Sequence, residues 1–243
     1  MERTVEAELQ RLRKEIEECR VSPLAESSPR VVFGEGDPLS PMTIVGEGPG
    51  EREEQEGRPF VGRAGQLLDK VMATVGLTRG EIWLTNVLKR RAFEMVEGRV
   101  KNRLPRANEL AVYKELLDRE LRIVSPRLIL CLGNLAANVL IHRGFRMTKE
   151  HGQWFSGVSG RKLMATFHPA YILRLEGAEF DEIMRQTVDD FTAAATDYRV
   201  LREQSPADIH QQPAAGKESR DTQPGGNRGR GYPSSLLGRE SKS

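Results

Sequence analysis

Hydrophobic residues recur along the first twenty positions at intervals of three and four. They are Val5, Leu9, Leu12 and Ile16, and Glu, Arg and Lys occupy most of the positions between them. Because this spacing puts the apolar side chains on one face of an α-helix, it predicts an amphipathic helix over residues 1–21. We expect that face to pack on the rest of the chain or on a partner.

From Met42 onward, short apolar runs alternate with helical periodicity. Strands are expected at 42–45, 82–85, 128–132 and 162–167, and helices at 65–75, 109–123, 134–143 and 180–199. This alternation predicts an α/β fold of three α/β/α layers with a central, mainly parallel sheet. Residues 22–203 are expected to form this one domain, which begins with a loop and a short extended stretch over 22–41.

The composition changes after Glu203. Gln, Ser, Pro, Gly and Arg dominate residues 204–243, and apolar residues are few. Such a segment cannot bury enough apolar surface to offset the entropy of ordering. We therefore expect a disordered tail, whose Arg-Gly pieces are more typical of a plain tail than of a nucleic-acid contact.

Charge and composition narrow the possible functions only slightly. The 37 basic and 35 acidic residues give a net charge of +2, which does not by itself indicate nucleic-acid binding. A DNA-binding surface must then be local, and each basic cluster could equally be a solvated face. Without a signal-peptide or membrane-length apolar run, and with two cysteines, the chain is expected to be a cytoplasmic monomer without a disulfide framework.

Polar residues follow several of the expected strands. Glu47 stands in the turn Gly46–Gly50, Asn86 follows Thr85, Gly133-Asn134 follows Leu132, and His168 follows Phe167. In open α/β sheets, ligands bind in the crevice beyond the carboxyl ends of the strands. We expect these four loops to converge on one cleft.

Each of these residues also has a structural interpretation. The turn at Glu47 lacks the Lys-Ser/Thr of a phosphate-binding loop, and Pro49 removes an amide donor, so nucleotide binding is disfavoured, although a purely structural turn stays open. Phe60 could pack in the core or offer a stacking platform for a base. Asn86 could read a pyrimidine edge or cap a helix, and a lone His168 is more often structural.

Five motifs in order resemble the family 4 uracil-DNA glycosylases. They are Gly46-Glu47-Gly48-Pro49-Gly50, the segment from Gly57 to Leu68, Thr85-Asn86-Val87-Leu88-Lys89, Asn102-Arg103-Leu104-Pro105, and the segment from His168 to Arg174. The resemblance implies a uracil-DNA glycosylase fold. It also implies hydrolysis of the N-glycosidic bond of uracil in single- or double-stranded DNA, near the nucleoid.

The resemblance also assigns roles to the matching residues. Glu47 would position or activate the attacking water, and the Gly48 backbone would line the pocket. Phe60 would stack on the extruded base, Asn86 would read its edge, and His168 would hydrogen-bond the uracil O2. Glu51 is assigned to the same pocket, and contacts with DNA are assigned to Arg174, Lys89, Arg91 and Lys101.

The chain departs from this family at the cysteines that hold an iron–sulfur cluster. The four matching positions are Cys19, Ser22, Arg90 and Tyr113. Because cluster binding normally uses four cysteine ligands, we predict that the chain has no cluster and no other cofactor. The N-terminal segment would then be held by ordinary packing, with Arg90 paired to a carboxylate and Tyr113 filling the vacated space.

A second departure lies between Lys89 and Asn102, where a short proline-rich loop is expected. The segment 90–101 is longer and basic, and it lacks the histidine with which a related branch traps the sugar covalently. We expect its Arg and Lys side chains to contact the DNA backbone.

Two alternatives to an active glycosylase remain, a catalytically weakened DNA-binding protein of the same fold and an unrelated nucleotide-binding α/β protein.

Overall fold

The computed structural model describes residues 2–18 and 24–204. Within these residues a six-stranded sheet runs in the order β1-β3-β2-β6-β8-β7. Its strands are β1 (Glu35–Gly36), β2 (Met42–Gly46), β3 (Trp83–Asn86), β6 (Leu128–Leu132), β7 (Phe155–Ser156) and β8 (Lys162–Thr166).

The four central strands are parallel. Ile44 of β2 pairs with Leu84 of β3 on one side and with Leu130 of β6 on the other, and Leu130 pairs in turn with Met164 of β8. The edge strands β1 and β7 pair antiparallel. Every residue of β2, β3 and β6 is buried, which explains why these strands read as continuous apolar runs rather than as alternating patterns.

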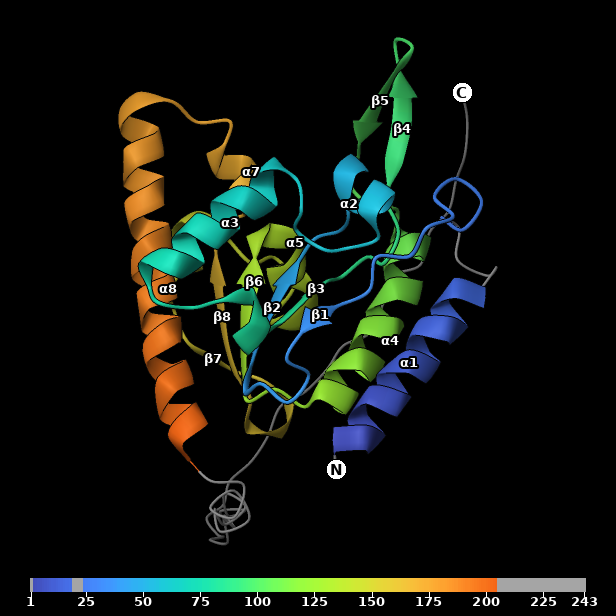
Figure 1. Cartoon of the computed structure of the whole chain (residues 1–243). Helices are drawn as coiled ribbons and strands as arrows, with labels where there is room; N and C mark the ends of the chain where they lie inside the picture. Colours follow the sequence, from blue (N-terminus) through green and yellow to red (C-terminus); the bar gives the residue numbers. More distant parts are fainter. Residues whose placement is uncertain (1, 19–23, 205–243) are drawn as a thin grey trace, which may run out of the picture. The chain divides into compact units, whose positions relative to one another are not determined.

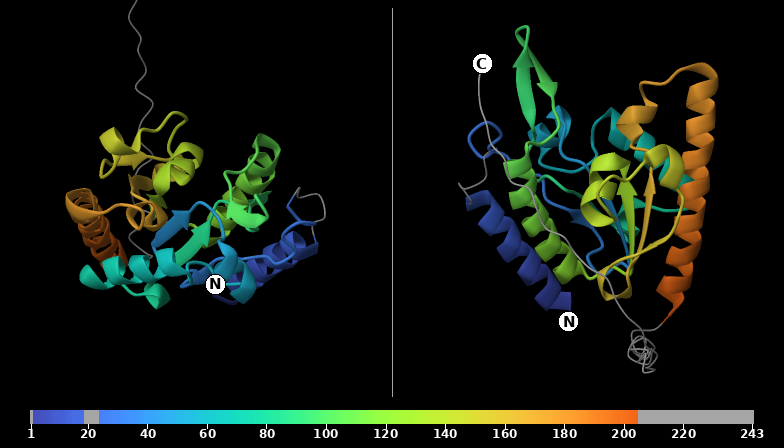
Figure 2. Two further views of the ribbon diagram at one scale, coloured as in Figure 1. Left: turned by 90° about the horizontal axis from the view of Figure 1, so that it is seen from above. Right: turned by 180° about the vertical axis from the view of Figure 1, so that it is seen from behind.

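Helices cover both faces of the sheet (Figures 1 and 2). Helices α3 (Arg63–Thr74) and α8 (Gly177–Glu203) pack on one face, where Leu68 and Phe191 join the cluster around Ile44. Helices α4 (Ala107–Val124) and α5 (Gly133–Leu140) cover the other face, where Leu117 and Ala137 join a second cluster. The expected three-layer α/β/α fold with a mainly parallel sheet is confirmed.

The amphipathic helix expected at the N-terminus is present as α1 (Glu2–Glu18), and it packs against α4. Leu12 and Ile16 are buried in a cluster that also contains Tyr113 of α4. Both terminal nitrogens of Arg119, on α4, donate hydrogen bonds of 2.6 Å to the Glu15 carboxylate. The apolar face of α1 is therefore covered by the same chain.

Several short elements do not follow from the hydrophobic pattern. The segment expected to be a loop contains a hairpin, β4 (Phe93–Val96) and β5 (Arg99–Asn102), whose turn residues Glu97 and Gly98 have φ angles of 51° and 74°. Two consecutive positive φ angles are typical of a tight hairpin turn, which Asn-Gly or Asp-Gly signals far more clearly than Glu-Gly. The other short elements are α2 (Glu51–Glu56), η1 (Arg79–Glu81), α6 (Met147–Glu150), η2 (Val158–Gly160) and α7 (Pro169–Ile172).

Two of the sequence-based expectations lie outside the described residues. The expected tail over 204–243 is described only at Gln204, and neither Cys19 nor Ser22 is described. Within the described part of the chain, no helix is long and apolar enough to cross a membrane.

Arg90 joins the end of α1 to the loop that follows it. Its buried guanidinium donates to the carbonyl oxygens of Ile16 and Glu17 at 3.2 and 3.3 Å, and to those of Ser28, at 2.9 Å, and Pro29. The last carbonyls of a helix have no partner within the helix and favour a nearby cation. The expected pairing with a carboxylate is therefore wrong, because backbone carbonyls take up the guanidinium.

Replacing Arg90 by alanine should lower the free energy of unfolding by about 3 kcal/mol, because it leaves buried carbonyls without donors. Urea titration followed by circular dichroism measures the change. The matched control is Arg13→Ala, which removes an exposed ion pair with Glu17 on α1 and should cost less than about 1 kcal/mol. Equal losses in the two variants would contradict the role given to Arg90.

Candidate active site

A cavity of about 430 Å³ opens beyond the carboxyl ends of the central strands, within the usual range for small-ligand sites. It gathers six of the residues assigned from the sequence, namely Glu47, Gly48, Phe60, Asn86, His168 and Arg174. Three of the four expected loops therefore converge on one cleft. The fourth, at Gly133, packs beside His168 without lining the cavity.

Gly46, at the end of β2, lies where two of these side chains meet. A Cβ atom on Gly46 would stand 2.5 Å from Asn86 Oδ1 and 2.6 Å from Phe60 Cζ, distances that real Cβ atoms do not adopt. Only glycine therefore lets the Phe60 ring and the Asn86 amide approach the strand this closely. Sequence reasoning had treated Gly46 as part of a turn and had not connected it with Phe60.

The loop that presents Phe60 has an unusual backbone. Phe60 is buried and has a φ angle of 55°, a conformation that few residues other than glycine adopt and that clusters at functional sites. Its carbonyl oxygen is packed so closely on Gly65 that a Cβ there would lie 1.8 Å away. The ring direction is thus set by the backbone.

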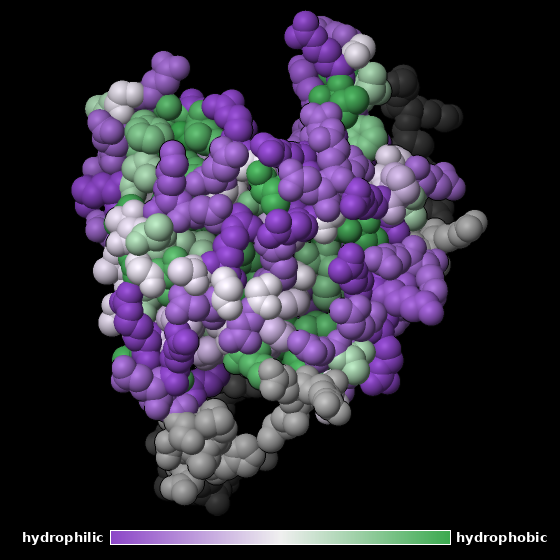
Figure 3. All heavy atoms as spheres, viewed as in Figure 1, coloured by the Kyte–Doolittle hydropathy of each residue, from purple (hydrophilic) through white to green (hydrophobic). Residues whose placement is uncertain are grey.

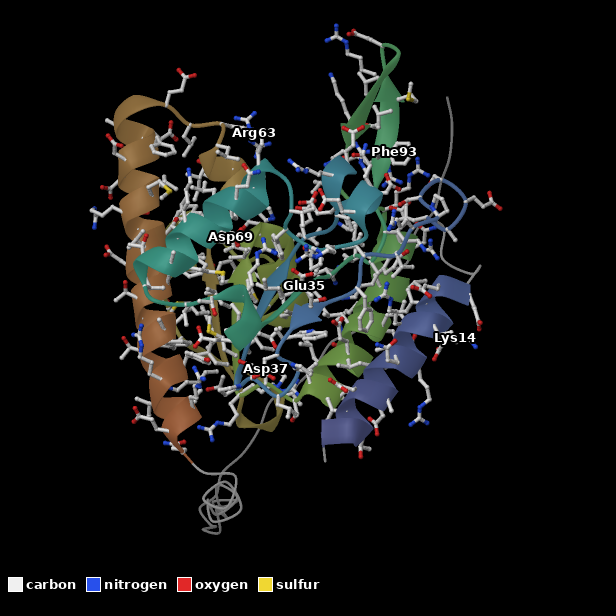
Figure 4. The ribbon with its side chains drawn as sticks, in the orientation of Figure 1. Lys14, Glu35, Asp37, Arg63, Asp69 and Phe93 are labelled. Atoms are coloured by element: carbon white, nitrogen blue, oxygen red, sulfur yellow. The ribbon has the colours of Figure 1, made fainter. Side chains whose placement is uncertain are left out.

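Arg79 fixes this loop from outside the cavity. Its guanidinium donates to the carbonyl oxygens of Phe60 and of Pro59, the latter at 3.1 Å. It is held in turn by Asp69 of α3 at 2.6 Å and by Glu35 of β1 at 3.0 Å, both labelled in Figure 4. No motif in the sequence singles out Arg79, because its partners lie ten to 44 positions away.

Glu53 links the two loops that bound the cavity. Its carboxylate is buried and accepts the amide of Gly50 at 3.2 Å and the amide of Gly62 at 2.8 Å. One side chain thus fixes the turn that carries Glu47 relative to the loop that carries Phe60. Sequence reasoning missed Glu53, since it stands in an acidic run whose members look alike.

The side chain of Asn86 is buried at the end of β3. The residue is 3% exposed, and among the described residues no donor reaches its Oδ1 atom. Buried polar atoms are nearly always hydrogen-bonded, so an acceptor without a donor on a residue that lines a cavity points to a ligand with a donor. The Asn86 backbone is held from behind, because Lys89 Nζ donates to its carbonyl oxygen at 2.7 Å.

The predicted contact between Lys89 and DNA is wrong. Its side chain is wholly buried behind the sheet edge, where Nζ lies 2.5 Å from Glu120 Oε2 and donates to Thr85 Oγ1 at 2.6 Å. Burial lowers the pKa of Lys89, and the neighbouring Glu120 carboxylate opposes that effect. Lys89 supports the end of β3 instead of reaching solvent.

The other assigned residues lie outside the cavity lining. Glu51 is exposed at the start of α2 and does not line the cavity, which contradicts its place in the uracil pocket. Arg91 is buried and donates to Asn102 Oδ1 at 2.7 Å, with Glu54 at 3.5 Å, so it is occupied within the protein. Lys101 is exposed on β5, opposite Glu94.

His168 is held as a neutral ring in one tautomer. It caps α7, where its Nδ1 atom accepts the amide of Ala170 at 3.0 Å. Although part of the residue stays accessible, the surrounding atoms desolvate the ring and, with a smaller effect of Arg174, lower its pKa to about 4. A neutral imidazole that accepts at Nδ1 carries its proton on Nε2, so His168 can donate a hydrogen bond from Nε2.

Glu47 is a partly desolvated carboxyl group in the same cavity. Burial raises the pKa of Glu47 above its usual value, and the positive charge of Arg174 partly opposes this shift. Such a carboxylate is a stronger base than one in water. Arg174 itself is exposed at the cavity wall, with its guanidinium 5.9 Å from the Tyr171 ring.

The residues at the cluster positions do not fit an iron–sulfur cluster. Arg90 is a buried cation already bonded to carbonyls, and Tyr113 is wholly buried in the cluster between α1 and α4. Neither side chain supplies a thiolate, which is the ligand such clusters require. Among the described residues no group of three His, Cys, Asp or Glu side chains could hold a metal ion.

The chain belongs to the uracil DNA glycosylase superfamily, whose family model matches residues 33–192. A type-4 uracil-DNA glycosylase of Thermotoga maritima is 34% identical over 175 residues, which are 72% of this chain and 88% of the relative. That of Pyrobaculum aerophilum is 35% identical over 174 residues, 69% of this chain and 85% of the relative. A DNA polymerase of Bacillus phage SP01 is 28% identical over 152 residues, which are 62% of this chain and 16% of that protein.

The histidine rings offer a direct test of this electrostatic picture. In a pH titration followed by NMR, His168 should titrate near pH 4 and show the tautomer protonated at Nε2. Arg174→Gln should move that titration to higher pH, because it removes a cation that disfavours the imidazolium. His142 is the internal control, since its contacts with Arg143 and Glu150 raise its pKa above 6.5. A His168 titration near 6.5 would overturn the assignment.

Proposed function

We propose that this protein hydrolyses the N-glycosidic bond of uracil in DNA and leaves an abasic site. The observation that carries the proposal is the unsatisfied Oδ1 atom of Asn86, set beside Phe60 and His168 in one cavity. The superfamily match and the relatives named type-4 uracil-DNA glycosylase support the same reaction.

Asn86 suits the edge of uracil. Uracil offers a donor at N3 and an acceptor at O4, and an amide side chain offers the matching pair, Oδ1 to accept and Nδ2 to donate. Cytosine presents the reverse pattern, so an amide held in this orientation distinguishes the two bases. The Asn86 side chain packs against Gly46, its pairing partner at the end of β2, which restricts where the amide can lie.

Phe60 supplies a flat surface for the base. A base inside a duplex cannot reach a cavity at the sheet edge, so the nucleotide must be extruded at a cost of a few kcal/mol or be presented on a single strand. Stacking on an aromatic ring offsets about 1–3 kcal/mol of that cost. Because Arg79 and Gly65 fix the loop, the ring needs no rearrangement when the base enters.

The chemistry follows from where charge develops. As the bond between C1′ and N1 breaks, its electron pair goes to uracil and gathers partly on O2, while the sugar becomes an oxocarbenium ion. His168 can donate from Nε2 to O2, and the loss of such a donor typically costs about a hundredfold in rate. Glu47 would orient water and accept its proton as oxygen bonds to C1′, and its negative charge would stabilise the cationic sugar.

Arg174 and Tyr171 are suited to the DNA strand at the cavity wall. Arg174 is exposed there, and its cation can pair with a phosphate while it modulates Glu47 and His168. We infer activity on both single and double strands, by a monomer that works at the nucleoid in the cytoplasm. We also infer that no iron–sulfur cluster takes part, since Arg90 and Tyr113 occupy two of its positions.

The decisive measurement is uracil release from a single-stranded oligonucleotide, with iron content determined on the same preparation. The wild-type chain should release uracil without iron, and Glu47→Ala and His168→Ala should each slow release by about a hundredfold or more. Glu51→Ala is the matched control, because it removes a neighbouring carboxylate outside the cavity and should leave the rate unchanged. Binding of the oligonucleotide without abasic product would instead support a catalytically weakened DNA-binding protein.

Gly46→Ala should lower kcat/KM for uracil release by about a hundredfold, because the added methyl displaces the Asn86 amide and the Phe60 ring. Gly80→Ala is the control, since a Cβ at that position meets nothing within 4 Å. The thermal unfolding midpoints of both variants show whether a loss of activity comes from a distorted site or from an unfolded chain. A fully active Gly46→Ala protein would show that the two side chains are not held against β2.

A further inference from the structure

The hairpin β4–β5 stands beside the candidate active site. Figures 1 and 2 show it projecting past α2 from the sheet edge at which the central strands end, and Phe93 at its base is labelled in Figure 4. Asn102, the last residue of β5, lines the cavity together with Arg103 and Leu104. A DNA strand that delivers a nucleotide to this cavity must pass close to the hairpin.

One face of the hairpin is apolar and exposed. Met95 pairs with Val100 and Phe93 pairs with Asn102, so these four side chains share a face of the hairpin. Asn102 also lines the cavity, so this face continues to the cavity. Met95 is 62% exposed and Val100 is 45% exposed. Figure 3 shows hydrophobic residues on the projecting hairpin at the upper right.

A further apolar residue follows the hairpin at the cavity itself. Leu104 lines the cavity, yet 69% of its surface is exposed. Together with Met95 and Val100 it accounts for three of the large hydrophobic side chains that are exposed in the described part of the chain. Exposed apolar groups of this size beside a ligand cavity indicate contact with apolar parts of a ligand.

The charges of the hairpin argue against phosphate as that ligand. Glu94 stands opposite Lys101, and Glu97 in the turn is followed by Arg99 at the start of β5. The acidic and basic charges of the hairpin therefore cancel. Arg91 at its base is engaged by Asn102 and Glu54 and lies against the Phe93 ring. Affinity for phosphate needs an excess of cations, which this segment lacks despite its basic appearance in the sequence.

We propose that the face formed by Phe93, Met95 and Val100 holds unpaired bases of the strand that carries the uracil. The proposal rests on the proposed function, because it takes the cavity as the uracil site. Four residues per strand reach about 13 Å, which is long enough to contact a short run of bases. Bases present apolar faces to such a surface only when they are unstacked, so the hairpin favours single-stranded or opened DNA.

The test compares two single-stranded oligonucleotides that contain one uracil. One has normal neighbours, and the other has abasic residues beside the uracil, with the same phosphates. The wild-type chain should bind the oligonucleotide with abasic neighbours more weakly. In the double variant Met95→Ser with Val100→Ser, KM for the oligonucleotide with normal neighbours should rise by about tenfold, while kcat stays within twofold. The double variant should also lose the difference between the two oligonucleotides.

Val158→Ser is the matched control, because Val158 is an apolar residue that is 84% exposed and does not line the cavity. It should leave KM and kcat unchanged. An unchanged KM in the double variant, or an equal loss on both oligonucleotides, would overturn the proposal. So would a shift in sedimentation of the wild-type chain that the double variant abolishes, since the face would then join two copies. Absence of uracil release from the wild-type chain would instead refute the proposed function.

Discussion

The site depends on the close contact of Phe60 and Asn86 with Gly46, on the side of its Cα atom where any other residue would carry a Cβ atom. This contact brings a loop, the end of β3 and the end of β2 to within van der Waals distance, and it leaves no room for even a methyl group. Glu53, in the cavity wall, and Arg79, outside the cavity, then hold the loops through backbone groups. Because the constraints act on the backbone, the cavity is shaped before any ligand enters, and little side-chain ordering remains to be done on binding.

The sheet and its main helices could be predicted from the sequence because buried parallel strands produce continuous apolar runs. Glu47, Asn86 and His168 could be predicted as neighbours for a related reason, since each follows a strand whose end must lie at the same edge. The roles of Glu53 and Arg79 could not. Their partners are separated from them by loop residues without periodicity, and only the folded chain shows that a carboxylate in an acidic run faces two amides.

The basic run at Lys89, Arg90 and Arg91 shows how little a cluster of charges says about its surroundings. All three side chains are buried, and each has a different partner: the Glu120 carboxylate, the carbonyls at the end of α1, and the amide of Asn102. The sequence shows how many charged residues are present, but only the folded structure shows which of them are exposed to solvent. In the function proposed above, attraction to DNA falls to exposed groups such as Arg174, and the hairpin offers apolar surface instead of charge.

The attachment of α1 through Arg90 has a consequence for how the protein reaches its working form. Hydrogen bonds from a guanidinium to backbone carbonyls form as the chain folds, and they contain nothing that oxygen or a chelator can remove. A helix secured by a metal–sulfur group must wait for iron and sulfide to be delivered and can be lost again by oxidation. Under the proposal that no iron–sulfur cluster takes part, the attachment through Arg90 ties the maturation of the protein to synthesis of the polypeptide alone.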